Sequence, residues 1–566
     1  MPNMSAGQAV VEILRAEGVA YIFGVVGSAF LEIMDPMYGL EDIKYVGTRH
    51  EQGAGFMALG YALASGRPGV CMVTNGPGAT NMVTSIAGGY VTHAPMVTII
   101  GGNSQEHIGR DSFQEIDHVG VFRSVTKESV LVPYASRIPD LLRQAFRTAT
   151  AGKMGPVVVD IPRDIQNETN LNVDIPTPAK YRPPQLIPGD PTLIQRAANI
   201  IKKSIRPVII AGGGVKWSSG NEEVCKLAEL ISAPIVTSYA QCDAVPNDHQ
   251  LYVGSLGRAG APEAAEVVQN SDVILAIGTR LSHFTTFYDN RYIPSNAKII
   301  QIEIDQKELG RNFPVEVGIL GDARIVTMSL TEAISRTGKP EGPEQRLNFA
   351  ARLRETRRQR LDKEAPQAGT LLKPQHVYHE LRKIYPADAL TTLDAGAVSG
   401  IGYDRLNYSM NSLFSPLDLG CIGMSFPMAL GVKMARPNRP VISINGDGGF
   451  LYNVQEIETA VRWKIPVVSI VMNNNSWASE KAYQKFFYGE RYVEADITNP
   501  RLDKLMELFG GKGYFIDRIE DLGDALTDAI QSNTPSVIEI PVDPAELPFP
   551  ARAMDVLKDK TPTFSE

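Results

Sequence analysis

The feature that most constrains this fold is the alternation of short apolar runs with helical stretches along almost the whole chain. Runs such as "YIFGVVG" (21–27), "GVCMVTN" (69–75), "MVTIIGG" (96–102) and "PVVVDIP" (156–162) are continuously apolar and bounded by Gly or Pro. This pattern is typical of strands that are buried on both faces. Helical patterns, such as residues 50–66, lie between these runs. Strands that alternate with helices form parallel sheets with crossover helices, so the sequence predicts an α/β protein.

The alternation falls into three units, which we expect to be three doubly wound parallel-sheet domains. The predicted limits are 1–175 for the first domain, 190–335 for the central domain, 336–372 for a linker, 373–545 for the third domain and 546–566 for a C-terminal tail. A Pro-rich connector (175–191) follows the first domain, and the linker contains a charged helical stretch (344–365). A length of 566 residues fits about three to four domains of roughly 150 residues each.

Charge and cysteine usage narrow the class of protein. The net charge is −8 and basic runs are lacking, which argues against nucleic acid and anionic membranes as partners. No apolar run approaches the ~20 residues that a membrane span needs. Four cysteines (Cys71, Cys225, Cys242 and Cys421) are scattered without metal-ligand spacing, which predicts reduced thiols and a cytoplasmic location. We therefore expect a cytoplasmic protein that acts on a small molecule.

A candidate metal and diphosphate site lies in the third unit. Asp447 follows the apolar run "RPVISIN", and the next apolar run, "PVVSIVM", ends in Asn473, Asn474 and Asn475. If the two strands are neighbours in a parallel sheet, Asp447 and Asn474, which are 27 positions apart, face one point at the edge where such sheets bind ligands. A carboxylate and an amide oxygen, together with diphosphate oxygens, suit Mg²⁺. Alternatively, both segments are ordinary turns.

The arrangement resembles the signature of thiamine diphosphate enzymes, in which a Gly-Asp-Gly opening and an Asn-Asn closing flank a strand–helix–strand unit. The resemblance implies the three-domain fold of that family. It implies that Asp447 and Asn474 bind Mg²⁺ through their side chains and that Ser476 binds it through its backbone carbonyl.

The first unit contains the candidate catalytic carboxylate. The stretch "RHEQGAGFMALGYALASGRPGVCMVTNGPGATN" (49–81) resembles the pyrimidine-binding region of the acetolactate synthase group. The resemblance implies that Glu51 hydrogen-bonds a ring nitrogen of the cofactor's aminopyrimidine and activates it, and that Gln114, in "FQEID", is a second catalytic residue beside the cofactor. Alternatively, Glu51 is only an acidic residue that favours the N-terminus of a helix.

Further contacts with the cofactor follow from the same resemblance. Ile422, in "LGCIGMSFPMALG" (419–431), would bend the cofactor into its V shape. The complete set of predicted cofactor-binding residues is Gly27, Ser28, Glu51, Asn75, Gly76, Gly396, Ala397, Gly420, Ile422, Gly446, Gly448, Gly449, Asn474, Ser476 and Trp477.

The resemblance to acetolactate synthases implies a C–C bond lyase or carboligase that acts on a 2-oxo acid or aldehyde through an enamine. Two segments, Gly27-Ser28-Ala29 and residues 475–493, are instead similar to sulfoacetaldehyde acetyltransferases, which make acetyl phosphate. A non-catalytic regulator on the same fold is a third alternative, which the retention of Glu51, Asp447 and Asn474 disfavours.

Four basic side chains are candidates for binding an anionic group of the substrate, or else are surface and ion-pair residues: Arg49, His50, Lys481 and Arg491.

The cofactors and the assembly complete the expectations. Thiamine diphosphate and Mg²⁺ are expected. The "AGGG" run (211–214) is consistent with FAD or another nucleotide in the central domain, but glycines at strand ends are equally expected without a ligand, so a nucleotide is the less favoured reading. In the family resembled here, the two halves of each site come from different subunits, which implies a homodimer or homotetramer with shared sites.

Overall fold

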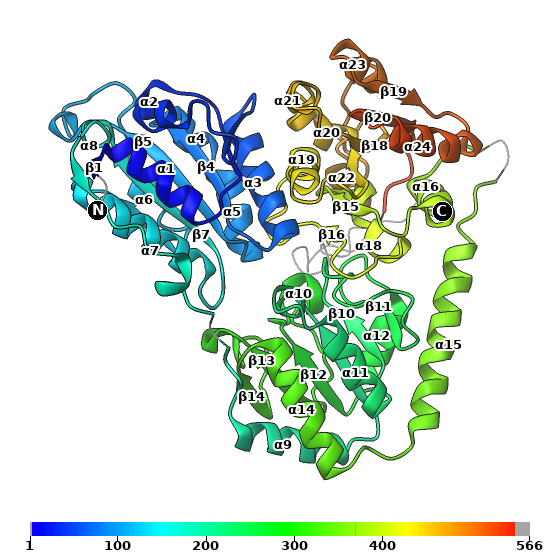
Figure 1. Cartoon of the computed structure of the whole chain (residues 1–566). Coiled ribbons are helices and arrows are strands. Elements are labelled where there is room, and N and C mark those ends of the chain that lie inside the picture. The colour runs from blue at the N-terminus through cyan, green and yellow to red at the C-terminus, as the bar shows by residue number, and fades with distance from the viewer. Residues whose placement is uncertain (1–2, 185, 368–369, 549–566) are drawn as a thin grey trace.

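The computed structural model of the protein, which describes residues 3–184, 186–367 and 370–548, contains three six-stranded sheets with flanking helices (Figure 1). All strand pairs within these sheets are parallel. The predicted α/β class with three parallel-sheet units is therefore confirmed. The predicted tail lies outside the described residues from 549 onward. Within the ranges described, no helix is both long enough and apolar enough to cross a membrane.

The first sheet has the strand order β3-β2-β4-β5-β7-β6. Its strands are β2 (Tyr21–Gly24), β3 (Lys44–Gly47), β4 (Gly69–Thr74), β5 (Met96–Gly102), β6 (Glu128–Leu131) and β7 (Pro156–Pro162). Its helices are α1 (Ala6–Ala16), α2 (Leu31–Met34), α3 (Glu51–Ser65), α4 (Pro77–Asn81), α5 (Val83–Thr92), α6 (His118–Phe122), α7 (Ile138–Thr150) and α8 (Arg163–Gln166). A small antiparallel pair, β1 (Asn3–Met4) with β8 (Leu171–Asn172), joins the two ends of this unit.

The side chains of β4 show that this sheet is buried on both faces. Val70 and Met72 belong to one hydrophobic core, and Cys71 and Val73 belong to another. Successive side chains of a strand point to opposite faces, so each face has its own core, as the continuously apolar runs predict.

The central sheet has the order β11-β10-β9-β12-β13-β14. Its strands are β9 (Pro207–Ala211), β10 (Ile235–Thr237), β11 (Tyr252–Ser255), β12 (Val273–Ile277), β13 (Lys298–Glu303) and β14 (Val317–Leu320). Its helices are α9 (Pro191–Lys202), α10 (Gly213–Trp217), α11 (Asn221–Ile231), α12 (Pro262–Gln269), α13 (His283–Thr286) and α14 (Ala323–Thr337).

Helix α15 (Pro343–Asp362) runs from the central unit to the third unit (Figure 1). Arg360 pairs with Glu263 of the central unit at 2.9 Å and with Asp404 of the third at 2.7 Å. Arg357 also pairs with Asp404, at 2.8 Å. Other charges of this helix form exposed pairs within it, such as Arg358 with Glu355. These charges thus form ion pairs within the helix and with both neighbouring units.

The third sheet has the order β16-β15-β17-β18-β20-β19, which repeats the strand order of the first sheet. Its strands are β15 (Leu390–Leu393), β16 (Leu413–Phe414), β17 (Val441–Gly446), β18 (Val467–Asn473), β19 (Lys512–Phe515) and β20 (Ser536–Pro541). Its helices are α16 (Pro374–Ile384), α17 (Ala397–Gly400), α18 (Gly402–Arg405), α19 (Ser425–Ala435), α20 (Asp447–Tyr452), α21 (Glu456–Arg462), α22 (Ala478–Phe487), α23 (Leu502–Leu508) and α24 (Leu522–Gln531).

Helices α3 and α19 join the first and third units across one continuous hydrophobic core. Each helix contains the tetrapeptide Met-Ala-Leu-Gly, at 57–60 and at 428–431. A Cβ atom on Gly60 would lie 2.1 Å from the carbonyl oxygen of Met428, and one on Gly431 would lie 1.9 Å from the carbonyl oxygen of Met57. The two helix backbones therefore approach closely because both contact positions are glycine.

Candidate active site

The register of β17 and β18 brings Asp447 and Asn474 to one edge of the third sheet. The two strands are parallel neighbours, and Gly446 lies opposite Met472. Asp447 starts α20 directly after β17, and Asn474 follows the end of β18. Both side chains are buried, with 2% of their surface exposed. The ends of β17 and β18 thus lie side by side, as the sequence predicts.

Asn499 organises the polar groups around Asp447. Its amide nitrogen donates to Asp447 Oδ2 at 2.7 Å, to Asn473 Oδ1 at 3.1 Å and to Asn475 Oδ1 at 3.2 Å. Burial raises the pKa of Asp447, and hydrogen bonds from Gly448 and Asn499 oppose that rise. A buried carboxylate of this kind is stabilised in its charged form by a nearby cation.

Several buried polar atoms around this edge have no hydrogen-bond partner among the described residues. They are Asn474 Nδ2, Ser476 Oγ and Asn499 Oδ1. Buried polar groups nearly always have hydrogen-bond partners, so three unpaired polar atoms close together indicate a polar ligand. In the part of the chain that the structure describes, no three His, Cys, Asp or Glu side chains are arranged to hold a metal. One carboxylate with amide and carbonyl oxygens is the donor set that suits Mg²⁺ shared with a diphosphate, so the residues fit the predicted group.

Two glycines after Asp447 allow close packing. A Cβ on Gly448 would lie 2.5 Å from the ring of Trp477, and one on Gly449 would lie 2.2 Å from Asp394 Oδ2. Asp394 accepts N–H groups from Gly423 at 3.1 Å and Met424 at 3.2 Å, and burial raises its pKa to about 7. Asp394 thereby links the loop before α19 to the start of α20.

The other predicted residues of the third unit lie on loops around the ends of its strands. Gly396 (φ 133°) immediately precedes α17, which begins at Ala397. Gly420 (φ 73°) and the half-buried Ile422 lie in the loop before α19. Ser476 forms an isolated antiparallel bridge with Asp496.

Glu51 is the first residue of α3 and is half-buried. Asn81, the last residue of α4, donates its amide N–H to Glu51 Oε2 at 2.9 Å. A Cβ on Gly78 would lie 3.3 Å from Glu51 Oε1. Helix α4 therefore lies directly against the carboxylate. In addition, the third unit reaches the start of α3, because the buried Glu456 accepts the backbone N–H groups of Arg49 at 3.2 Å and His50 at 3.0 Å.

The turn at Asn75 and Gly76 lies beside Gln114. The Asn75 amide donates to Asn103 Oδ1 at 2.9 Å, and a Cβ on Gly76 would lie 2.7 Å from the carbonyl oxygen of Gln114. Gly27 packs against Thr74, while Ser28 is exposed at the start of a short 3₁₀ turn. The predicted residues of the first unit thus gather around the end of β4.

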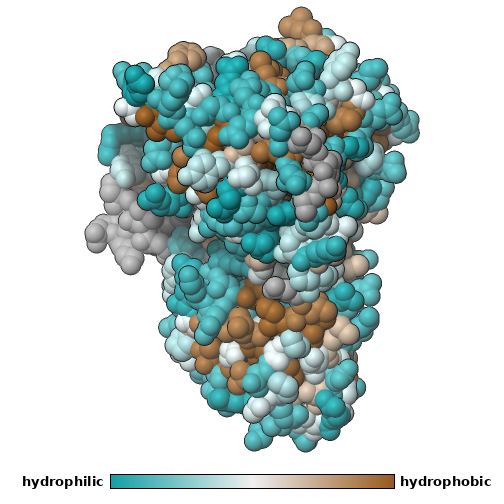
Figure 2. Space-filling model, turned by 60° about the vertical axis from the view of Figure 1, so that its left-hand side comes forward, coloured by the Kyte–Doolittle hydropathy of each residue, from teal (hydrophilic) through white to brown (hydrophobic). Residues whose placement is uncertain are grey.

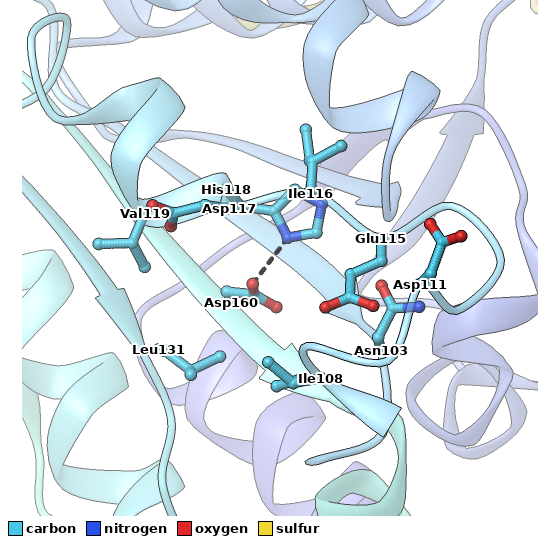
Figure 3. Close-up of a pocket in the computed structure, with 10 residues that line it drawn as sticks. All are labelled: Asn103, Ile108, Asp111, Glu115, Ile116, Asp117, His118, Val119, Leu131 and Asp160. Carbon is cyan, nitrogen blue, oxygen red and sulfur yellow. Dashed lines mark hydrogen bonds and ion pairs between the residues drawn. The ribbon is translucent and has the colours of Figure 1, made fainter. Parts of the chain in front are cut away.

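Close to this turn is a cavity of about 460 Å³ (Figure 3). It is lined by Asn103, Ile108, Asp111, Glu115, Ile116, Asp117, His118, Val119, Leu131 and Asp160.

The side chains of Glu51 and Asp447 share no hydrogen-bond partner among the described residues, although Glu456 of the third unit holds the backbone just before Glu51. The side chain of Glu51 contacts Asn81 of the first unit, whereas that of Asp447 contacts Asn499 of the third.

The four candidate anion-binding side chains have different surroundings. Lys481 pairs with Asp496 at 2.5 Å and lies over the ring of Tyr492. His50 Nδ1 accepts the N–H of Gln52 and caps α3. Arg49 and Arg491 are both exposed, and the backbone of Arg49 is held by Glu456.

In the central unit, two of the three glycines of the "AGGG" run, Gly212 and Gly214, are explained by packing. A Cβ on Gly212 would lie 2.4 Å from the carbonyl oxygen of Gly278, and one on Gly214 would lie 2.6 Å from Gly278 Cα. This close contact between two strand ends requires glycine without any bound nucleotide.

Four residues were missed by sequence reasoning: Asp394, His118, Glu456 and Asn499. Asp394 carried a signal, because it follows the apolar run "ALTTL" as Asp447 follows "RPVISIN". The other three contact partners that are distant in the sequence, and no local pattern marks them.

Comparison with known proteins agrees with this geometry. Residues 4–121 match the model described as thiamine pyrophosphate enzyme, N-terminal TPP binding domain, residues 194–330 match the central domain, and residues 394–540 match the C-terminal TPP binding domain.

Three relatives cover nearly the whole chain. A probable acetolactate synthase large subunit of Methanocaldococcus jannaschii is 36% identical and covers 96% of this chain and 93% of its own. A sulfoacetaldehyde acetyltransferase of Castellaniella defragrans is 34% identical, with 94% and 91% covered. An acetolactate synthase large subunit of Haemophilus influenzae is 34% identical, with 97% and 96% covered. The three matching domains and the full-length relatives show that this chain is a thiamine pyrophosphate-dependent enzyme and belongs to the thiamine pyrophosphate enzyme family.

Proposed function

We propose that this enzyme binds thiamine diphosphate through Mg²⁺ and acts as a C–C bond lyase or carboligase on a 2-oxo acid or aldehyde. The observation that carries the proposal is the buried Asp447 beside Asn474 and Ser476 at the adjacent ends of β17 and β18, where several polar atoms have no hydrogen-bond partner among the described residues. The full-length similarity to acetolactate synthase large subunits supports the reaction class.

The chain's own residues have distinct roles in this proposal. The side chains of Asp447 and Asn474 and the backbone carbonyl of Ser476 hold Mg²⁺. Glu51 holds a proton between its carboxylate and a cofactor ring nitrogen, and Gln114 lies beside the cofactor. The bound cofactor supplies the electron sink for the bond that breaks, while the protein supplies geometry and electrostatics.

The remaining predicted contacts divide between two surfaces. The residues at the end of β4 would face the aminopyrimidine, and the loops of the third unit would face the diphosphate and the bend of the cofactor. These contacts are Gly27, Ser28, Asn75 and Gly76 on the first surface, and Gly396, Ala397, Gly420, Ile422, Gly446, Gly448, Gly449 and Trp477 on the second.

The assembly in this proposal is a homodimer or homotetramer in which each site takes Glu51 from one subunit and Asp447 from another. The separate hydrogen-bond networks of these two residues within one chain support it. Hydrophobic side chains also gather on the lower part of the surface in Figure 2, where the central unit lies. Exposed apolar areas of this kind are typical of protein–protein contacts. The four free cysteines of the described residues fit a reducing cytoplasm.

A second candidate is an acetyltransferase that takes a sulfonated aldehyde and phosphate and releases acetyl phosphate and sulfite. The specific observation in its favour is the similarity to the Castellaniella defragrans enzyme, together with the Gly27-Ser28-Ala29 segment. In this case Lys481 or Arg491 would face the anionic group, and Lys481 would exchange its contact with Asp496.

The test is a product screen of the purified enzyme with pyruvate, glyoxylate, benzaldehyde and sulfoacetaldehyde, each with and without phosphate. A cofactor-dependent C–C product from a 2-oxo acid or aldehyde supports the first proposal. Phosphate-dependent sulfite release supports the second. The matched control is the same protein after chelation and removal of thiamine diphosphate, and full activity in that control would contradict both.

A further inference from the structure

His118 connects the wall of the cavity in Figure 3 to the turn that precedes α4. Its ring is 3% exposed. The Nδ1 atom lies 2.7 Å from Asp160 Oδ2 on β7, and Nε2 accepts the backbone N–H of Gly76 at 2.9 Å. An imidazole nitrogen that accepts a hydrogen bond carries no proton, so Nδ1 carries the hydrogen and donates it to Asp160. The two contacts together fix one neutral tautomer.

Gly76 is the residue whose position His118 controls. It precedes α4 with φ 55° and ψ −113°, a conformation that glycine adopts without strain. Its backbone packs against Gln114. Among the described residues, the Gly76 N–H donates to His118, so a lost contact would leave a buried amide unpaired, which is costly.

Helix α4 carries the effect of this contact to Glu51. The helix is only five residues long, so its first residue and its last move together. Asn81 at its end donates to Glu51 Oε2 at 2.9 Å, and Gly78 lies beside Oε1. A continuous series of contacts therefore runs from Asp160 through His118, Gly76 and α4 to the carboxylate.

We propose that His118, whose ring Asp160 orients and whose Nε2 accepts the Gly76 N–H, is a positioning residue that fixes the start of α4 and thereby aligns Asn81 with the Glu51 carboxylate. The proposal rests on the proposed role of Glu51. It names a contact that acts through the backbone of Gly76 rather than on the substrate or cofactor.

The experiment compares two amide replacements. His118→Gln places an oxygen near the former Nε2 position and keeps an acceptor for Gly76, whereas His118→Asn keeps a donor near Asp160 but does not reach Gly76. The matched control is His107→Gln, because His107 is exposed in the same unit. Hydrogen–deuterium exchange of the peptide 75–82 is measured on each full-length protein, together with kcat and KM.

In His118→Asn we expect faster exchange in residues 75–82 and a fall in kcat of about 10-fold to 10²-fold with a smaller change in KM, the scale of a misplaced catalytic group. In His118→Gln we expect retained protection and a higher kcat than in His118→Asn, because the amide oxygen still accepts the Gly76 N–H. The control should match the unchanged protein in all of these measurements.

Unchanged exchange in His118→Asn would overturn the proposal whatever the activity, as would altered exchange with unchanged kcat. Exchange requires neither cofactor nor turnover, so it tests the His118 contact even if the proposed reaction is wrong. If His118→Asn fails to fold, His118→Gln decides the matter, because it keeps an acceptor for the Gly76 N–H. Loss of protection of residues 75–82 in His118→Gln would then refute the role of His118.

Discussion

The contact between α3 and α19 gives a sharp prediction about how the first and third units are held together. In Gly431→Ala, the new Cβ would lie 1.9 Å from the carbonyl oxygen of Met57. Favourable contacts between heavy atoms lie at about 3.5 Å or more, so the helices would have to separate by roughly 1.5 Å. The clashing atom belongs to the backbone of a helix and cannot rotate away. The substitution therefore disturbs the packing between the two units.

The expected change in the free energy of unfolding follows from two opposing effects. Alanine is favoured over glycine in a helix interior by about 1 kcal/mol. Overpacking a tight core costs about 1–3 kcal/mol, and the rigid backbone contact favours the upper end. Gly88→Ala is the matched control, because Gly88 is also buried inside a helix but the nearest atom to its new Cβ would lie 3.6 Å away. The control receives the gain in helix propensity without the clash, so the two variants should differ by about 3 kcal/mol.

The assay is thermal unfolding of both variants under identical conditions. For domains of this size, 1 kcal/mol corresponds to about 2–4 °C, so Gly431→Ala should unfold roughly 6–12 °C below Gly88→Ala. Gly60→Ala, which meets Met428 at 2.1 Å, should behave like Gly431→Ala. Equal unfolding temperatures for Gly431→Ala and its control would refute the inference that this helix contact depends on glycine.

Three further predictions concern the site and the buried carboxyl groups. Asp447→Ala should weaken thiamine diphosphate binding in the presence of Mg²⁺, as measured by calorimetry, because the charged ligand is lost; unchanged affinity would contradict its role as a metal ligand. Glu51→Gln should bind the cofactor yet lose about 10²-fold or more in kcat. If sites are shared between subunits, mixing Glu51→Gln chains with Asp447→Ala chains should restore part of the activity, with subunit exchange checked by mass spectrometry. A monomer that is fully active at low concentration would exclude shared sites. Burial raises the pKa of Glu303 from 4.5 to about 7, so its contribution to stability is fully present below pH about 4.5 and is lost as the pH rises through about 7. Glu303→Gln should therefore flatten the profile of unfolding temperature against pH in this range. An unaltered slope would show that Glu303 does not cause the pH dependence.

The strands show how far local sequence determines the fold. The apolar runs at 96–102 and 156–162 coincide with β5 and β7, residue for residue. Within the three six-stranded sheets, the strands that the pattern did not reveal are β6, β11, β14, β16 and β19, and each of them lies at an edge of its sheet. Several edge strands are short or half-exposed, such as β16 with two residues and β19 with a mostly intermediate burial pattern. Long continuous apolar runs are typical of strands covered on both faces, so the central strands carry the clearest signal.

In the candidate site, too, some features follow from local sequence and others depend on tertiary contacts. The sequence by itself placed Asp447 and Asn474 at strand ends and Glu51 at the start of a helix, because turn residues and apolar periodicity are local properties. The tertiary structure decided which groups surround them: Asn499 at Asp447, Glu456 at the backbone before Glu51, and Asp160 with His118 behind Gly76. These partners are separated from their targets by 42 to 407 positions, and a hydrogen bond depends on distance in space rather than in sequence. Strands and turns could thus be inferred from one segment at a time, whereas the orientation of each functional group required the packing of segments that are distant in the sequence.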